Sequence, residues 1–214
     1  MSSNSRRALL GIIDGGIYTV AVQKPHSISR RSIFTTAPLI PLAALGAAPE
    51  QAFAPAQLRL IEAFVDRLIP SDENGPGARE SGAAIYIDRS FAGPLAEEKP
   101  ALLKALAAVD AFARSTQHAA LAELPPDKQD AVLTAIENND VPGFTPDSRT
   151  FFYRMRQLAF EGMFGDPFYG GNRNFAGWDL IRYPGPRMAV SAEEQKLRVP
   201  VKKLRTSARA THGH

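Results

Sequence analysis

Apolar residues recur at intervals of three and four through most of the chain after residue 49, which is the spacing of one buried helix face. The first such stretch contains Leu58, Ile61, Val65 and Leu68, with Phe64 beside them. Pro55 stands near its start, where proline is tolerated, and Pro70 ends it, because proline cannot continue a helix. The pattern therefore predicts a helix between these two prolines.

Four more helices are expected by the same criterion. They lie at about residues 79–91, from 95 or 97 to 121, from Pro125-Pro126-Asp127 to Asn138-Asn139-Asp140, and at about 147–164. Their expected core positions are Leu102, Leu106, Val109 and Phe112 or Ala113, then Val132, Leu133 and Ile136, and finally Phe151, Phe152, Met155, Leu158, Ala159 and Met163. Few stretches alternate with period two, so we predict an all-α fold, a small bundle of about five helices.

Residues 165–187, which we call the aromatic segment, break the helical pattern and are predicted to form a long loop. The segment is rich in glycine and proline, yet it carries Phe168, Tyr169, Phe175, Trp178 and Tyr183. A long loop with this many rings needs a surface on which to bury them. Two interpretations remain open, packing on the chain's own bundle and contact with a partner protein, and both can hold for different rings.

The N-terminal part has the pattern of an export signal. Arg30 and Arg31 stand before Phe34 and an apolar run at residues 37–45. The run is too short, and too interrupted by proline, to cross a bilayer as a helix, which takes about 20 residues. It has the length of a signal-peptide core, and small residues follow at 46–48. Paired arginines here are typical of the twin-arginine route, although such a pair also occurs by chance in a mobile N-terminus.

We therefore divide the chain into a leader with a twin-arginine signal peptide at 1–48, a helical domain at 49–187 and a basic C-terminal tail at 188–214. Cleavage is expected between residues 46 and 54. Residues 1–24 contain a second, weaker apolar stretch. We interpret it as an extended leader or as translation from upstream of the true start codon, with a membrane anchor as the remaining alternative.

Charge is distributed unevenly along the chain. The net charge of +3 combines a basic leader, a body with 12 basic and 19 acidic residues at 49–181, and eight basic and two acidic residues from 182 onward. A nucleic-acid-binding domain carries basic residues on its folded body, so this distribution argues against nucleic acid as a partner. The tail is expected either to be a solvated end or to meet an acidic partner or anionic lipid. The chain has no cysteine, which excludes disulfides and iron–sulfur ligation.

We find no convincing catalytic, cofactor-binding or metal-binding constellation in the sequence. His118 is alone in the body, without a partner at metal-ligand spacing, and is expected to be structural or exposed. The glycines at 170–171 follow a helix rather than a strand, so they indicate a turn and not a dinucleotide fingerprint. The stretch at 72–75 superficially resembles a calcium loop but lacks its alternating ligands and distant glutamate. We expect a turn there as well.

Two long motifs stand far apart in the sequence. The first motif reads Val-Asp-Arg-Leu-Ile-Pro-Ser-Asp-Glu-Asn-Gly-Pro-Gly-Ala at 65–78, followed by Tyr-Ile-Asp at 86–88. The second motif reads Asp-Pro-x-Tyr-Gly-Gly-Asn at 166–172 and Gly-Trp-x-Leu-Ile-x-Tyr-Pro-Gly at 177–185. With the twin-arginine leader, these motifs make the chain resemble the gluconate 2-dehydrogenase subunit 3 family over roughly residues 53–187.

The resemblance implies a non-catalytic small subunit of a periplasmic, membrane-bound dehydrogenase that oxidises a sugar, polyol or sugar acid. In such a complex a large subunit holds FAD and performs the oxidation, and a multihaem cytochrome c subunit, carrying haem c, passes electrons towards quinone and holds the complex at the membrane. The small subunit stabilises the flavoprotein and accompanies it through export, so the chain itself is expected to hold no cofactor. The Arg30-Arg31 signal is then expected to export the small subunit and the flavoprotein as a preassembled pair.

The alternative is a free-standing periplasmic helical module that binds a small ligand with the aromatic segment. It predicts a stable monomer that binds its ligand alone, whereas an accessory subunit is expected to need its partner. An independent enzyme fits least, because no acid–base or nucleophile pair can be named. The five rings of the aromatic segment are the candidate contact residues under either interpretation.

Overall fold

The computed structural model describes residues 12–13, 16–17, 51–187, 189–196 and 200–209. The chain divides into two units, Met1–Gly46 and Ala47–His214, which we describe separately. In the first unit, β1 (Ile12–Ile13) pairs antiparallel with β2 (Gly16–Ile17), two very short strands that the sequence did not predict. The export-signal residues Arg30, Arg31 and Phe34 lie outside the described residues.

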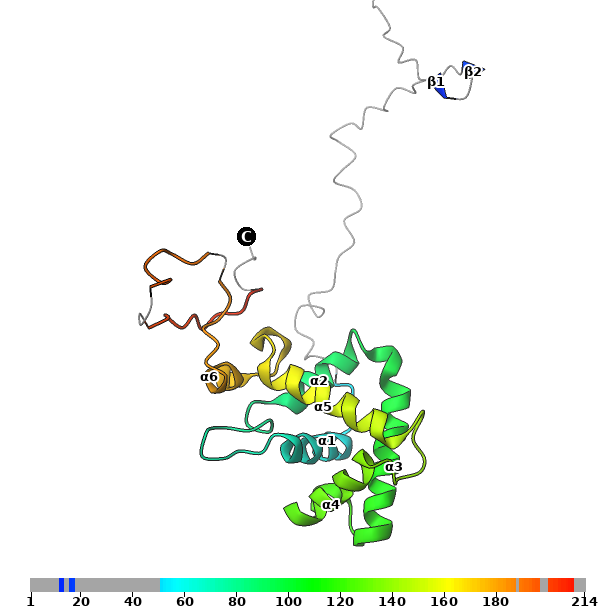
Figure 1. The fold of residues 1–214 in the computed structure, drawn as a ribbon. Helices are drawn as coiled ribbons and strands as arrows, with labels where there is room; N and C mark the ends of the chain where they lie inside the picture. The colour runs from blue at the N-terminus through cyan, green and yellow to red at the C-terminus, as the bar shows by residue number, and fades with distance from the viewer. Residues whose placement is uncertain (1–11, 14–15, 18–50, 188, 197–199, 210–214) are drawn as a thin grey trace, which may run out of the picture. The chain divides into compact units, whose positions relative to one another are not determined.

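The described part of the second unit is helical, which confirms the all-α fold (Figure 1). Its α-helices are α1 (Pro55–Leu68), α2 (Ala83–Ala92), α3 (Lys99–Gln117), α4 (Pro126–Glu137), α5 (Ser148–Phe164) and α6 (Ala176–Leu180). The first five correspond to the five predicted helices. Among the described residues, none of the helices combines the length and the apolar character needed to cross a membrane.

Two helix ends differ from the prediction because of local backbone geometry. α2 begins at Ala83 rather than at residue 79, since Gly82 before it has a left-handed backbone with φ of 77°. α3 ends at Gln117 rather than at residue 121, because His118 turns left-handed with φ of 63°. Leu121 then starts a separate 3-10 turn, η4 (Leu121–Glu123). His118 is thus the exposed cap of α3, one of the two roles expected for it.

The core is organised around α5, which lies across the bundle and contacts α1, α2, α4 and α6 (Figure 1). The predicted core positions of α5 are all buried: Phe151, Phe152, Met155, Leu158, Ala159 and Met163. The ring of Phe64 meets that of Phe151 edge-on, with centroids 5.6 Å apart. α2 and α5 approach closely at Gly162, where a Cβ atom would lie 2.8 Å from the Cα of Ala83.

A buried carboxylate ties the beginning of the domain to α2. Asp88 lies in α2, and its Oδ1 accepts the backbone N–H groups of Ala52 at 2.9 Å and of Phe53 at 3.0 Å. The ring of Phe53 packs against Phe91, with centroids 5.5 Å apart. The Tyr-Ile-Asp part of the first motif therefore positions the segment that leads into α1.

Candidate partner interface

Within the predicted long loop, the second motif and the residues between its parts fold as two 3-10 turns and a short helix. The turns are η5 (Pro167–Tyr169) and η6 (Arg173–Phe175), and α6 follows. Asp166 starts η5, because its Oδ1 accepts the N–H of Phe168 at 2.9 Å. α6 has five residues, little more than one helical turn of about 3.6 residues. A helix this short leaves no periodic pattern in a sequence.

Asn172 holds the second motif against α5. Its side chain is fully buried; Nδ2 donates to the carbonyl oxygen of Gly165 at 2.8 Å, and Oδ1 accepts the N–H of Gly177 at 2.9 Å. Its backbone N–H donates to the carbonyl oxygen of Gly162 at 2.7 Å. Its φ is 46°, in the left-handed region that asparagine tolerates better than most residues. One side-chain amide therefore joins the end of α5 to the beginning of α6.

Two glycines let the backbone of the second motif lie directly on α5. A Cβ atom on Gly171 would stand 2.0 Å from the carbonyl oxygen of Gly162, and one on Gly177 would stand 2.0 Å from that of Met163. Neither gap accommodates a side chain. The expectation that Gly170-Gly171-Asn172 forms a turn is confirmed. Gly170 supplies a left-handed backbone with φ of 99°, and Gly171 permits the close backbone contact.

Trp178 is an interior residue of the aromatic segment. It is buried, and its Nε1–H donates to the carbonyl oxygen of Phe164 at 2.9 Å. The ring of Phe175, itself half-buried, lies 5.4 Å from it, and that of Tyr183 meets it nearly edge-on at 4.9 Å. Trp178 thus packs on the chain's own α5.

The other rings of the segment remain accessible. Phe168, Tyr169 and Tyr183 are exposed to 52%, 48% and 39%. Phe168 and Tyr169 stand perpendicular to each other with centroids 5.3 Å apart. Exposed neighbouring rings are unfavourable in water and are typical of contact surfaces. The five aromatic residues are therefore divided between interior packing and an outward surface.

A hollow of about 400 Å³ opens beside Trp178. It is lined by Phe164, Asp166, Trp178, Ile181, Tyr183, Pro186 and Ala208. Ile181 is exposed to 54%, so an apolar side chain of the second motif stands open to solvent at this hollow.

A stripe of aromatic residues on α5 leads to the hollow. Tyr153, Phe160 and Phe164 are spaced seven and four residues apart, so they share one helix face. Tyr153 and Phe160 are exposed to 44% and 47%, and Phe160 stacks on Phe164 at 5.8 Å. Sequence reasoning missed Tyr153 and Phe160 because it followed the buried face of α5. The two aromatic residues at helical spacing on the opposite, polar face of α5 could have indicated this stripe in the sequence.

The basic tail folds back onto the second motif. Asp179 of α6 binds Lys203 at 2.7 Å and Arg205 at 2.6 Å. The guanidinium of Arg205 lies 5.5 Å above the Phe175 ring, and that of Arg209 lies 5.1 Å above Phe168. The tail was expected to be a solvated end or to meet an acidic partner or anionic lipid. Its described residues instead contact acidic side chains of the chain's own domain.

These contacts change the ionisation of the acids that hold the tail. The hydrogen bond from Lys203, followed by that from Arg205, keeps the pKa of Asp179 below its ordinary value. Burial raises the pKa of Asp166, but hydrogen bonds from Ser207, Phe168 and Ala208 outweigh it, so the net pKa is also lowered. Both carboxylates are therefore stabilised in the charged form while the tail is in place.

The first motif forms the corner between α1 and α2. Asp72 Oδ1 accepts the N–H of Asn74 at 2.8 Å, and the N–H of Ala78 donates to the carbonyl oxygen of Ile69 at 2.8 Å. The expected turn at 72–75 is confirmed. A Cβ atom on Gly77 would lie 2.4 Å from the carbonyl oxygen of Ile69, so the chain folds tightly back on itself here.

The two motifs meet in space although roughly one hundred residues separate them in the sequence. The N–H of Arg173, between the two parts of the second motif, donates to the carbonyl oxygen of Ser81, between the two parts of the first, at 2.9 Å. A second hollow, of about 500 Å³, is lined by Asn74 and Pro76 from the first motif and by Asn174, Ala176, Asp179, Leu180 and Arg182 from the second motif and its vicinity. The motifs thus build one continuous part of the surface.

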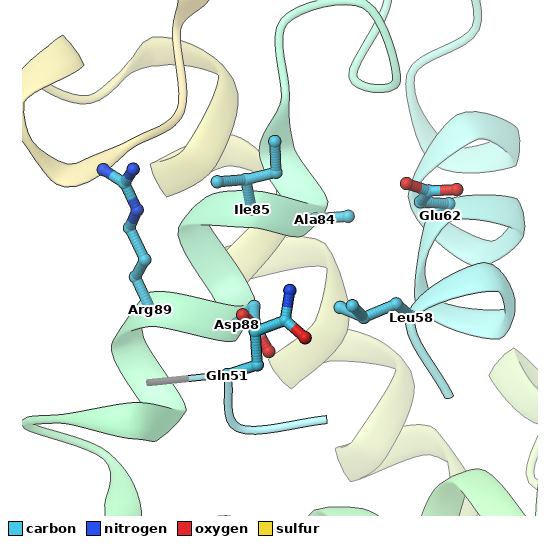
Figure 2. A pocket seen from close by; sticks show the side chains of 7 residues that line it. All are labelled: Gln51, Leu58, Glu62, Ala84, Ile85, Asp88 and Arg89. Carbon is cyan, nitrogen blue, oxygen red and sulfur yellow. The ribbon is translucent and has the colours of Figure 1, made fainter. Parts of the chain in front are cut away.

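A third hollow, of about 200 Å³, lies between α1 and α2 (Figure 2). Figure 2 shows Leu58 and Glu62 of α1 across from α2, whose Arg89 extends to the opposite side. Asp88, the buried acid that lines this hollow, already accepts hydrogen bonds from two backbone N–H groups. Among the described residues, no group of three or more His, Cys, Asp or Glu side chains is placed to hold a metal ion.

A family profile matches the domain that carries both motifs. The family profile described as gluconate 2-dehydrogenase subunit 3 matches residues 55–185, from the first residue of α1 to the end of the second motif. The chain belongs to the gluconate 2-dehydrogenase subunit 3 family. No curated protein and no solved structure matches the chain. The region shared with the subunit 3 family includes the α5 stripe and both motifs, and it ends before the basic tail.

Proposed function

We propose that this subunit 3 protein is the small, non-catalytic subunit of a periplasmic, membrane-associated dehydrogenase complex that oxidises a sugar, polyol or sugar acid. The observation that carries the proposal is the family match over residues 55–185. A large subunit would hold FAD and perform the oxidation, and a multihaem cytochrome c subunit would hold haem c and link the complex to the membrane. We assign no role in binding FAD or haem c to the residues that the structure describes.

The exposed aromatic surface supports a role in assembly. Phe160 of the α5 stripe and Ile181 at the adjoining hollow stand open to solvent inside the family-matched region. Large exposed apolar groups of this kind are typical of a surface that is covered by a partner. We assign the α5 stripe and the hollow lined by Phe164 and Tyr183 to contact with the large subunit.

Co-expression tests the assembly. The chain, produced together with a flavoprotein dehydrogenase encoded beside its gene, is expected to purify as one complex. Phe160→Glu places a charge on the stripe and is expected to weaken the complex about 30-fold, the size of a hot-spot loss. Ala107→Glu, at an exposed position of α3, is the matched control. A chain that stays monomeric beside the flavoprotein and binds a small ligand by itself would contradict the proposal.

Export is tested at Arg30 and Arg31. We propose that they direct the preassembled pair through the twin-arginine route, because a flavoprotein acquires FAD before it crosses the membrane. Changing both arginines to lysine keeps the charge, and it is expected to leave the dehydrogenase activity in the cytoplasmic fraction. Unchanged periplasmic activity of the flavoprotein would show that this signal does not export it.

A further inference from the structure

The basic tail is seated on a surface of distinctive chemistry. We define the acid–aromatic surface as Asp166, Phe168, Tyr169, Phe175 and Asp179. All five side chains lie within the family-matched region, whereas the tail segment that contacts them, Val201 to Arg209, lies beyond it. The surface therefore belongs to the matched domain, and the tail segment that occupies it lies outside the match.

The acid–aromatic surface recognises cationic side chains in two ways. Asp179 binds two of them directly, Lys203 and Arg205. Aromatic rings bind the guanidinium groups, with Arg209 5.1 Å from the Phe168 centroid and 5.9 Å from that of Tyr169. Arginine suits both roles, because its planar group pairs with carboxylates and stacks on rings.

The surface also contacts the main chain of the segment that it holds. The N–H of Leu204 donates to the carbonyl oxygen of Pro184 at 2.6 Å, and the N–H of Ala208 donates to Asp166 Oδ2 at 2.7 Å. The backbone of Leu204 comes so near Gly185 that a Cβ atom there would lie 2.1 Å from its carbonyl oxygen. Main-chain contacts of this kind fit an extended peptide with basic residues at intervals.

The tail is held in a way that permits exchange. The side chains of Lys203 and Arg205 are exposed to 52% and 48%, and Val201 to 51%. Exposed ion pairs contribute little to stability and are weakened by salt. The tail remains in place because it is tethered, which supplies a high effective concentration. A basic segment of a bound partner has the same advantage once the partner has docked.

We propose that the acid–aromatic surface is the docking site for an extended arginine- and lysine-bearing segment of the large dehydrogenase subunit, and that the chain's own tail occupies the site until that segment replaces it. The identity of this partner rests on the proposed function. The ability of the surface to bind a basic segment does not, and the two are tested separately.

The surface is tested with a labelled peptide of residues 200–209 supplied to the full-length chain. A tail that occupies the site about nine-tenths of the time lowers the apparent affinity of a competitor roughly tenfold. The full-length variant Lys203→Gln/Arg205→Gln/Arg209→Gln releases the tail and is expected to bind the peptide about tenfold more tightly than the unaltered chain. Equal binding by both chains, with melting temperatures unchanged, would overturn the proposal.

The matched control removes three positive charges outside the tail. Arg59→Gln/Lys104→Gln/Lys128→Gln changes exposed residues of α1, α3 and α4, and it is expected to leave peptide affinity unchanged. A gain equal to that of the tail variant would mean that net charge alone drives binding, which also defeats the proposal. Adding Asp179→Asn to the tail variant is expected to remove the gain, because the carboxylate is the anchor.

The partner is tested with the purified large subunit. The tail variant is expected to bind it about tenfold more tightly than the unaltered chain, and excess peptide is expected to compete. A complex that neither change affects would refute the docking site and leave the proposed function standing. If no complex forms, the proposed function and the partner assignment both fail, while the peptide result still decides what the surface binds. Concentration-dependent dimers that the tail variant abolishes would assign the site to a second copy instead.

Discussion

At the scale of single residues, a buried asparagine organises the part of the protein that carries the second motif. Asn172 satisfies a carbonyl oxygen at the end of α5 and an N–H at the beginning of α6. A buried polar group that loses its partner costs about 1–3 kcal/mol. The residue type, and not only the turn that it makes, is therefore needed at this position.

We expect Asn172→Gly to lower the free energy of unfolding by roughly 2–4 kcal/mol, because a buried N–H and a half-buried carbonyl oxygen lose their hydrogen bonds. Glycine keeps the left-handed backbone available, so the substitution isolates the amide. Asn174→Gly is the control, since Asn174 also has a positive φ but an exposed side chain. Denaturant unfolding of both variants measures the difference. Equal losses would show that the buried amide has no special role.

Trp178 gives a second expectation at this scale. Trp178→Ala removes a buried ring and is expected to cost about 3–5 kcal/mol, seen as a lower thermal midpoint and a lower yield of assembled complex. Phe168→Ala removes an exposed ring of the same segment and is expected to leave the midpoint nearly unchanged. If the two variants melt alike, Trp178 does not belong to the interior.

At the scale of elements, short polar and backbone contacts decide how the helices join. The second motif lies on α5 through Gly171 and Gly177, and the segment before α1 lies on α2 through Asp88. Such contacts connect elements without adding apolar area. They explain why polar and glycine residues form so much of both motifs.

Asp88→Ala is expected to destabilise the chain by about 2–3 kcal/mol, because the N–H groups of Ala52 and Phe53 lose their acceptor. Asp88→Asn retains an oxygen at the same place and is expected to restore most of the loss. Hydrogen exchange at these two N–H groups measures the contact directly. Exchange in Asp88→Ala as slow as in the unaltered chain would show that another group holds the segment.

At the scale of the whole molecule, seating of the tail is expected to depend on pH. Contact with the tail lowers the pKa of Asp179 and, on balance, that of Asp166. A carboxyl with a lowered pKa stabilises its contact fully above its ordinary pKa, near 4. That stabilisation is lost as the pH falls through the lowered value. The tail is therefore expected to stay seated at neutral pH and to leave the surface below about pH 4.

A dye on the tail measures this release. The chain has no cysteine, so Lys202→Cys accepts a thiol-reactive dye at one place, and its fluorescence anisotropy is expected to fall when the tail leaves. Circular dichroism confirms that the helices remain folded. In an Asp166→Asn/Asp179→Asn background the anisotropy is expected to be low already at neutral pH. A high, pH-independent anisotropy in that background would show that the acids do not hold the tail.

The sequence by itself determined the all-α class, the five longer helices, the turn at 72–75 and the family. These follow from local information: apolar spacing marks a buried helix face, prolines mark helix boundaries, and long motifs identify relatives. The two helix ends at Gly82 and His118 were displaced because a left-handed backbone leaves no periodic trace.

Only the tertiary structure decided which rings of the aromatic segment are buried, that α6 exists and that the tail covers Asp179. Each depends on contacts with other parts of the chain. Trp178 donates to the carbonyl oxygen of Phe164, α6 begins at the N–H that Asn172 accepts, and Arg205 of the tail pairs with Asp179. Composition shows that aromatic and basic residues are present. Burial and pairing are properties of the neighbours that folding brings to them, and those neighbours are not adjacent in the sequence.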